Sequence, residues 1–187
     1  MRGYLGTEVK GEGIEPAFKC SELDRILIVH EDGRYRVVAP TEKLFVDRDV
    51  LHFCIFDREQ PWLALYGSRK ESISYVKKFA FGGVILDKEY RCIPEKTKLH
   101  YFSTEIPQKI YVKYREYKLK DRQRKPPPNA RGPDKQTLRT DDLPLQNPKT
   151  KGTELSGRDI EEVKIERPRG WPEGEGESAL TPLLPLD

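Results

Sequence analysis

Short apolar runs alternate with charged turns along the first 115 residues, and the pattern returns about three times. Glu31-Asp-Gly-Arg34 is the turn of the first copy, and Gly67-Ser-Arg-Lys-Glu71 is the turn of the second. A repeat of roughly 36 to 40 residues, built from strand pairs, is typical of a propeller-like array of small antiparallel sheets. The paired runs lie at 23–30 and 35–38, at 62–66 and 73–79, and at 98–102 and 109–114.

The order of apolar and polar residues within the runs has the two-residue period of a β-strand. In 34–38, Tyr35 and Val37 share a face; in 73–79, Ile73, Tyr75 and Phe79 do. Runs 26–29, 51–56 and 63–66 are continuously apolar, which predicts strands covered on both faces. No stretch before 117 has a helical period. We therefore predict an all-β fold with about two and a half propeller-like β-pinwheel blades.

Glycines mark two of the predicted turns. Glu31-Asp32-Gly33 fits a hairpin in which Gly33 adopts a positive φ. Gly82-Gly83 predicts a bulge or a sharp bend between strands. Gly82-Gly83 is not a phosphate-binding loop, because the Lys-Ser/Thr of a nucleotide site is missing.

Composition changes after Tyr117 and predicts a boundary between a β-domain at 1–117 and a basic, proline-rich linker and disordered tail at 118–187. Segment 118–139 has eight Lys/Arg and two Asp, so its net charge is 8 − 2 = +6. It is either a plain linker or a disordered basic arm on DNA. A helix at 156–163 has a possible cap, but a segment this short is marginal in water.

The 187-residue chain has a net charge of only +3, so nucleic-acid affinity requires local clusters of cations. Cys20, Cys54 and Cys92 are odd in number and lack a zinc spacing, which indicates reduced thiols. No run reaches the ~18 apolar residues of a membrane span. We expect a cytoplasmic protein with no membrane partner.

Several of these phrases resemble the C-terminal β-pinwheel of bacterial type IIA topoisomerase A subunits, those of topoisomerase IV and of gyrase. The likeness covers residues 1 to about 115 and, more faintly, the segment that ends in Ile165-Glu-Arg-Pro-Arg-Gly-Trp171. The phrases that carry it are Gly3-Tyr-Leu-Gly6, the strand-turn-strand 24–34, the strand 74–79 and Asp87-Lys-Glu-Tyr90.

The resemblance implies a non-catalytic module that binds and bends duplex DNA for the full enzyme, an isomerase. Its partners would be a breakage-reunion domain, which supplies the nucleophilic tyrosine, and an ATPase subunit. Two departures stand out: the chain lacks the Gln-Arg-Arg-Gly-Gly-Lys-Gly box of gyrase, and it has fewer blades than the family. We therefore expect a C-terminal piece, from a split gene or a truncated frame, that is not catalytic alone.

The candidate DNA-binding residues are cations at similar places in their own copies of the repeat, where a stripe around the rim would contact phosphates. Lys78 is preferred to Lys77, because strand alternation prevents both from facing DNA. The same cations also fit a solvated strand edge. The full set is Arg34, Arg36, Lys78, Lys88, Arg91, Lys98, Lys113 and Arg115.

No catalytic, cofactor-binding or metal-binding residues are predicted. His30, His52 and His100 have no second ligand at a metal-binding spacing and are interpreted as core or strand-end residues. Cys54 is interpreted as a packing residue. The alternative function is an incomplete propeller that binds a protein through exposed blade edges. A continuous basic stripe would favour DNA, and a neutral aromatic groove would favour a protein.

Overall fold

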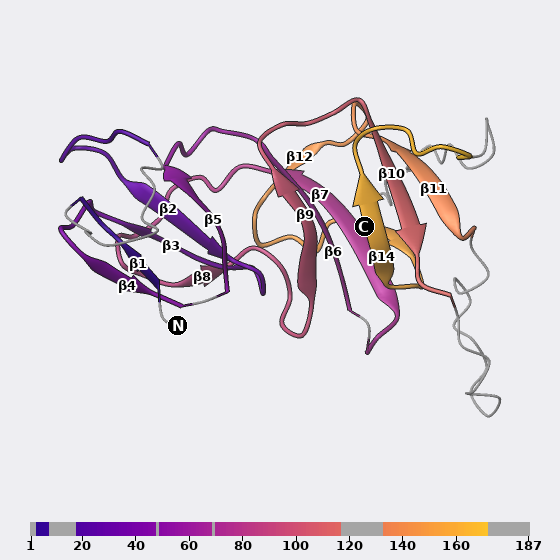
Figure 1. The fold of residues 1–187 in the computed structure, drawn as a ribbon, viewed down its shortest axis with the longest axis horizontal. Helices are drawn as coiled ribbons and strands as arrows, with labels where there is room; N and C mark the ends of the chain where they lie inside the picture. Colours follow the sequence, from indigo (N-terminus) through magenta and orange to yellow (C-terminus); the bar gives the residue numbers. More distant parts are fainter. Residues whose placement is uncertain (1–2, 8–17, 48, 69, 117–132, 172–187) are drawn as a thin grey trace, which may run out of the picture.

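The computed structural model describes residues 3–7, 18–47, 49–68, 70–116 and 133–171. Every regular element in these ranges is a β-strand, which confirms the all-β prediction. None of these residues belongs to a helix that could cross a membrane. Three sheets lie side by side along the long axis of the molecule, and a two-stranded ribbon flanks the first of them (Figure 1).

The first sheet has the order β5-β2-β3-β8, and all its neighbouring strands are antiparallel. Its two central strands form the hairpin predicted at Gly33, which has a φ of 79°. A short ribbon, β1-β4, packs beside this sheet. The strands are β1 (Gly3–Leu5), β2 (Ile26–His30), β3 (Arg34–Val38), β4 (Leu44–Val46), β5 (Val50–Ile55) and β8 (Tyr90–Arg91).

The second sheet has the order β12-β7-β6-β9, with β13 also paired to β7, and the third has the order β11-β10-β14. All pairs are antiparallel except β12 with β7. The strands of the second sheet are β6 (Trp62–Ser68), β7 (Ile73–Phe79), β9 (Lys98–Ser103), β12 (Leu145–Gln146) and β13 (Thr153–Ser156). Those of the third are β10 (Lys109–Tyr114), β11 (Lys135–Arg139) and β14 (Ile160–Lys164).

One three-strand unit occurs three times. In each unit the first strand pairs with both of the others, as in β2-β3-β5, β6-β7-β9 and β10-β11-β14. Each unit also has a β-bulge where its first strand pairs with its third. The bulges lie between Val29 and His30, Leu65 and Tyr66, and Lys113 and Tyr114. The repeat inferred from sequence is therefore present in the topology, although a propeller-like closure stays a prediction.

Each unit after the first contributes one or two strands to the sheet of the unit before it, an arrangement that we call strand exchange. The segment between the second and third strands of a unit pairs with the second strand of the unit before it: β8 of the second unit pairs with β3, and β12 and β13 of the third pair with β7. In the first unit the same segment, β4, pairs with β1. The first and second sheets are therefore each completed by a segment of the following unit.

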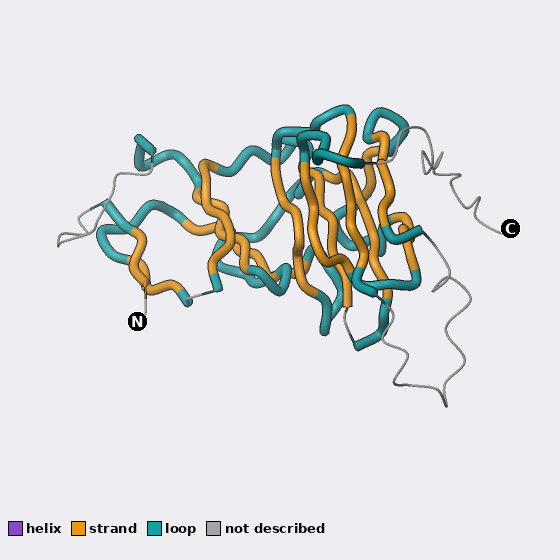
Figure 2. The backbone as a smooth tube through the Cα atoms, turned by 45° about the vertical axis from the view of Figure 1, so that its right-hand side comes forward, coloured by secondary structure: helices purple, strands orange, loops and turns teal. Residues whose placement is uncertain are grey.

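The strands of neighbouring sheets lie beside one another along the molecule (Figure 2). Apolar side chains of these sheets form buried clusters. Leu27, Tyr35, Trp62 and Tyr66 belong to the core between the first and second sheets. Val76, Leu65 and Ile110 belong to the core between the second and third. The predicted faces of 34–38 and 73–79 are confirmed, because Tyr35, Val37, Ile73, Tyr75 and Phe79 all belong to the first core or pack against it, whereas Val76 belongs to the second.

Two local predictions were wrong. The runs at 98–102 and 109–114 are not a strand pair, because β9 pairs with β6 and β10 pairs with β11 and β14. Strand β5 pairs with β2 alone among the described strands, so Leu51 and Ile55 are about two-fifths exposed instead of covered. The weak helical signal at 156–163 corresponds to no helix, and its residues from Ile160 onward belong to β14.

The predicted linker and disordered tail were also wrong for residues 133–171. These residues form β11 to β14, and they pair with strands that precede 117. They complete a third sheet, so two and a half blades understated the repeat. The rest of the predicted tail, 118–132 and 172–187, lies outside the described residues.

Replacing Gly33 with Ala is expected to lower the free energy of unfolding by about 3 kcal/mol. The positive φ costs about 1 kcal/mol for a residue with a Cβ, and this Cβ would lie 2.1 Å from Cγ1 of the buried Ile93. Relieving such overpacking costs about 2 kcal/mol more. Gly82 has a similar φ of 66° with nothing within 4 Å of a Cβ, so Gly82→Ala is the matched control. Equal losses in urea denaturation would contradict the packing argument.

Candidate nucleic-acid interface

The eight cations predicted to contact DNA are distributed over all three sheets and the loops beside them. Arg34 and Arg91 are opposite each other on β3 and β8 of the first sheet. Lys113 lies near the end of β10 in the third sheet, and Arg115 directly follows that strand. Lys78 lies on β7 in the second sheet. Whether any of them binds DNA stays a prediction, but their surroundings differ greatly.

Arg34 is held by three carboxylates. Its Nε lies 2.8 Å from Asp32 Oδ2, its Nη2 lies 3.0 Å from Asp49 Oδ2, and its Nη1 lies 3.4 Å from Glu89 Oε2. Partial burial opposes ionisation of Asp32, but the hydrogen bonds and charge of Arg34 outweigh it and hold the pKa of that carboxyl below its usual value. The Arg34 guanidinium is therefore paired with carboxylates of this chain.

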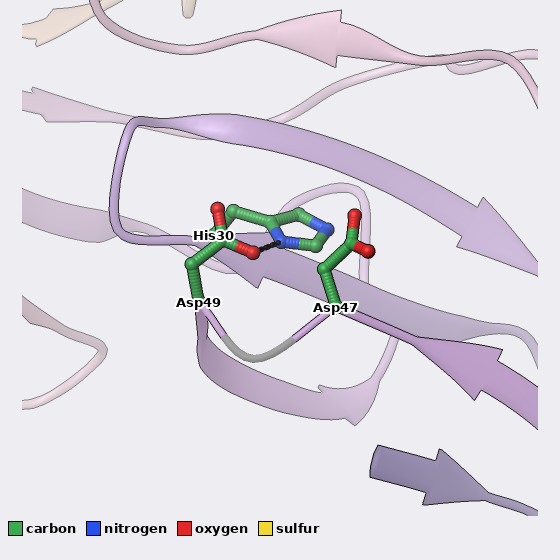
Figure 3. Close-up of side chains that lie close together, drawn as sticks. All are labelled: His30, Asp47 and Asp49. Atoms are coloured by element: carbon green, nitrogen blue, oxygen red, sulfur yellow. Dashed lines mark hydrogen bonds and ion pairs between the residues drawn. The ribbon is translucent and has the colours of Figure 1, made fainter. Parts of the chain in front are cut away.

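The same network contains a buried histidine. His30 Nδ1 lies 2.9 Å from Asp49 Oδ1, and Asp47 lies on the other side of the ring (Figure 3). Burial would raise the pKa of Asp49, but His30 and Arg34 lower it below its usual value. The ligand atoms of His30, Asp47 and Asp49 lie within 4.8 Å of one another, a proximity that sequence spacing did not indicate. Arg34 and His30 both pair with Asp49, so the contacts of that carboxylate are made within the protein.

Arg91 and Lys98 extend this cluster of opposite charges. Arg91 Nη2 lies 3.3 Å from Asp32 Oδ2, and Lys98 Nζ lies 2.7 Å from Glu31 Oε2. Lys88 is exposed, with its Nζ 5.5 Å from the centroid of the Tyr90 ring. Arg34, Arg91 and Lys98 face the four acids Glu31, Asp32, Asp49 and Glu89, so the charge of the cluster is 3 − 4 = −1.

The exposure of a strand cation depends on the side of the strand that it faces, as Arg36 on β3 and Lys77 and Lys78 on β7 illustrate. Arg36 is half-buried and donates from Nη2 to the Phe45 carbonyl at 3.3 Å. Lys77 is fully buried, whereas Lys78 is half-exposed, which confirms that the two face opposite sides. In the described part of the chain Lys78 has no ion-pair partner, so it is the rim candidate with the least competition.

Lys113 and Arg115 are paired with acids of the third unit. Lys113 Nζ lies 3.1 Å from Glu161 Oε2, and Arg115 Nε lies 3.1 Å from Asp159 Oδ2. His100 Nε2 lies 3.3 Å from the other oxygen of the buried Asp159. Burial would raise the pKa of Asp159, but His100 and Arg115 together hold it below its usual value. Asp159 therefore ties β9 to β10 and the start of β14.

Cys54, Cys92 and His52 are packing residues in this structure, whereas Cys20 is exposed. Cys20, Cys54 and Cys92 are all free thiols, and Cys54 packs against the first core. Burial raises the pKa of Cys92 to about 12, which disfavours a reactive thiolate. His52 packs edge-on against Trp62, with ring centroids 5.1 Å apart.

The outer face of the third sheet contains further cations, of which only Lys113 was predicted. Register and burial place them on the side of β11-β10-β14 away from the second core. Lys135, Arg139 and Lys164 were missed because 133–171 was interpreted as linker and tail. The strand cations of this face are Lys109, Lys113, Lys135, Arg139 and Lys164.

Comparison with protein families finds one match that spans most of the chain. Residues 1–167 match the model of the topoisomerase C-terminal domain of Bacteroidota. None of the curated proteins compared with the chain matches it. The family match includes the strands after 133, in keeping with their place in the sheets. The chain therefore belongs to the family of bacterial topoisomerase C-terminal domains that is described for Bacteroidota.

Proposed function

We propose that this domain binds and bends duplex DNA for a type IIA topoisomerase related to topoisomerase IV or gyrase, and that it contributes no catalytic residues. The match of residues 1–167 to a topoisomerase C-terminal domain carries the proposal. The proposed partners are duplex DNA, the breakage-reunion domain and the ATPase subunit, in the cytoplasm near the nucleoid. No cofactor is proposed for this chain.

Binding through the phosphate backbone predicts weak, sequence-tolerant and salt-dependent association. Four or five neutralised phosphates would give a log–log salt slope of roughly −4, at about 0.9 per contact. Fluorescence anisotropy with two unrelated duplexes measures this slope. The chain alone is expected to relax or cleave no DNA, with or without ATP and magnesium. Absence of duplex binding at low salt, or tyrosine-linked breaks made by this chain, would contradict the proposal.

A second candidate function is binding to a protein through a sheet edge. Strand β5 has only one paired neighbour among the described strands, and Leu51 and Ile55 on it are 42% and 41% exposed. An edge of this kind accepts an added strand, with apolar side chains that give specificity. Salt-independent association with the rest of the topoisomerase, together with absence of DNA binding, would favour this alternative.

A further inference from the structure

The two faces of the third sheet differ in composition. Ile110, Val112 and Leu138 point into the second core and are fully buried. The alternate residues point away from that core, and no other described sheet covers them (Figure 1). A terminal repeat unit requires a polar outer face for solubility, but that requirement does not select one sign of charge.

Cations dominate this outer face. In register, Lys109 is opposite Arg139, Lys113 lies between Lys135 and Glu162, and Tyr111 lies between Thr137 and Lys164. Three strands about 4.8 Å apart with about 3.4 Å per residue make a surface roughly 10 Å wide and 17 Å long. Duplex DNA has about one charge per 1.7 Å of its axis, so such a surface spans about ten phosphates.

The segment after β14 adds to the charge, and Trp171 fixes its course over the sheet. The Trp171 indole Nε1 donates to Thr137 Oγ1 at 3.0 Å, and its ring lies edge-on to Tyr111 with centroids 5.5 Å apart. Lys135 Nζ lies 5.4 Å from the Trp171 ring centroid. The exposed Arg167 and Arg169 precede Trp171 in the same segment, and Arg167 Nη2 donates to the Trp171 carbonyl at 3.3 Å.

The net charge of this surface exceeds that of the cluster around Arg34. Seven cations and the acids Glu161, Glu162 and Glu166 give 7 − 3 = +4, against −1 for the cluster around Arg34. Two of the seven, Lys113 and Lys164, are paired with Glu161 and Glu162. A polyanion is attracted to this surface and not to the cluster around Arg34. We name this surface the C-terminal basic face; its cations are Lys109, Lys113, Lys135, Arg139, Lys164, Arg167 and Arg169.

We propose that duplex DNA lies across the C-terminal basic face, held by contacts to its phosphates, and that the ion-paired rim of the first sheet makes little contribution. The inference rests on the proposed DNA-binding function and assigns that function to a surface. Phosphate contacts supply affinity without reading bases, which fits a domain that must accept any sequence. Trp171 and Tyr111 are already packed against the sheet, so they position the face and need not stack on bases.

The test compares two triple variants of the whole chain with equal loss of charge. The face variant is Lys135→Gln, Arg139→Gln and Arg169→Gln; the rim variant is Lys78→Gln, Lys88→Gln and Lys98→Gln. The three face residues have no ion pair among the described residues, so their loss leaves no acid unpaired. Circular dichroism melts verify that both variants fold as the wild type does.

Anisotropy titrations in rising salt are the measurement, on the same two unrelated duplexes. The face variant is expected to flatten the salt slope by about three contacts, because each phosphate contact contributes about 0.9. The rim variant is expected to change the slope by about one contact or less. If the face variant kept the wild-type salt slope, or if the rim variant lost more of the slope than the face variant, the assignment of DNA binding to this face would be overturned. The proposed DNA-binding function itself would still stand. Absence of binding by the wild type would overturn both proposals.

Discussion

Ending the chain at residue 117 is expected to leave a fragment without a stable fold. Strand β10 would lose β11 and β14, which are its only neighbours among the described strands. Of the nine buried residues in the second core, three lie after 133, so 9 − 3 = 6 would remain and become exposed. Exposing an apolar side chain costs about 1.5–3 kcal/mol, so the total of ~10 kcal/mol is comparable to the ~5–15 kcal/mol that stabilise a domain. The six are Leu63, Leu65, Val76, Ile110, Val112 and Tyr114.

A chain that ends at Trp171 is the matched control, since it keeps every described strand and the contacts of Trp171 with Tyr111 and Thr137. Thermal melts by circular dichroism and limited proteolysis compare the two. The 1–171 chain is expected to melt cooperatively, whereas the 1–117 fragment aggregates or is digested throughout. A cooperative melt of the fragment within a few degrees of the control would show that the third sheet is a separate folding unit.

The alternation of residues was sufficient to predict individual strands. The faces of β3 and β7 and the hairpin at Gly33 depend only on the two-residue period and on local turn chemistry, and the structure confirms them. Even the opposite directions of Lys77 and Lys78 followed from this period. Neighbours in sequence determine such features, so they are accessible without a structure.

Strand exchange explains most of what could not be predicted. The partner of β3 is β8, more than 50 residues later, and β7 is completed by β12 and β13, about 70 residues later. Composition also gave the wrong prediction after residue 133. The prolines and charged residues before β11 indicated a linker, although β11 is a short strand in which Leu138 is buried. The ion pairs of Arg34, Arg91, Lys98 and Arg115 also join distant residues, so no local pattern indicated which cations are neutralised.

Lys77 links the second and third units at one buried point. Its Nζ donates to the carbonyl of Cys92, to that of Pro148 at 2.7 Å and to that of Thr150 at 3.1 Å. Cys92 follows β8, which completes the first sheet, and the other two precede β13, which completes the second. The ammonium has three donors, and all three are used. The side chain therefore satisfies carbonyls on both exchanged segments.

Replacing Lys77 with Ala is expected to lower the free energy of unfolding by about 3–5 kcal/mol. The change leaves three carbonyls without this donor, and unsatisfied buried groups cost about 1–3 kcal/mol each. It also leaves a cavity where the four-carbon stem packs. Lys78→Ala on the same strand is the control, and it is expected to change stability by about 0.5 kcal/mol or less, because Lys78 is half-exposed. Urea denaturation measures both.

The pH dependence separates the buried charge from the packing of the stem. Burial lowers the pKa of Lys77 to about 8, from an ordinary value of 10.5. Between these two values the unfolded chain binds more protons than the folded one, so this group makes stability rise with pH. Below about pH 8 both states are protonated and the full cost of burying the ammonium is present. Lys77→Met keeps an unbranched apolar stem but cannot titrate.

The free energy of unfolding of the wild type relative to Lys77→Met is therefore expected to increase from pH 8 to pH 10.5 and to be constant from pH 6 to pH 7. Burial raises the pKa of Tyr35, Tyr66 and Tyr114, so stability falls in strong alkali, but this loss is common to both proteins and cancels in the difference. The measurement is a series of urea titrations at fixed ionic strength. A difference that does not vary with pH would mean that the three carbonyls hold the ammonium charged throughout, and that Lys77 acts as a permanent cationic link between the exchanged strands.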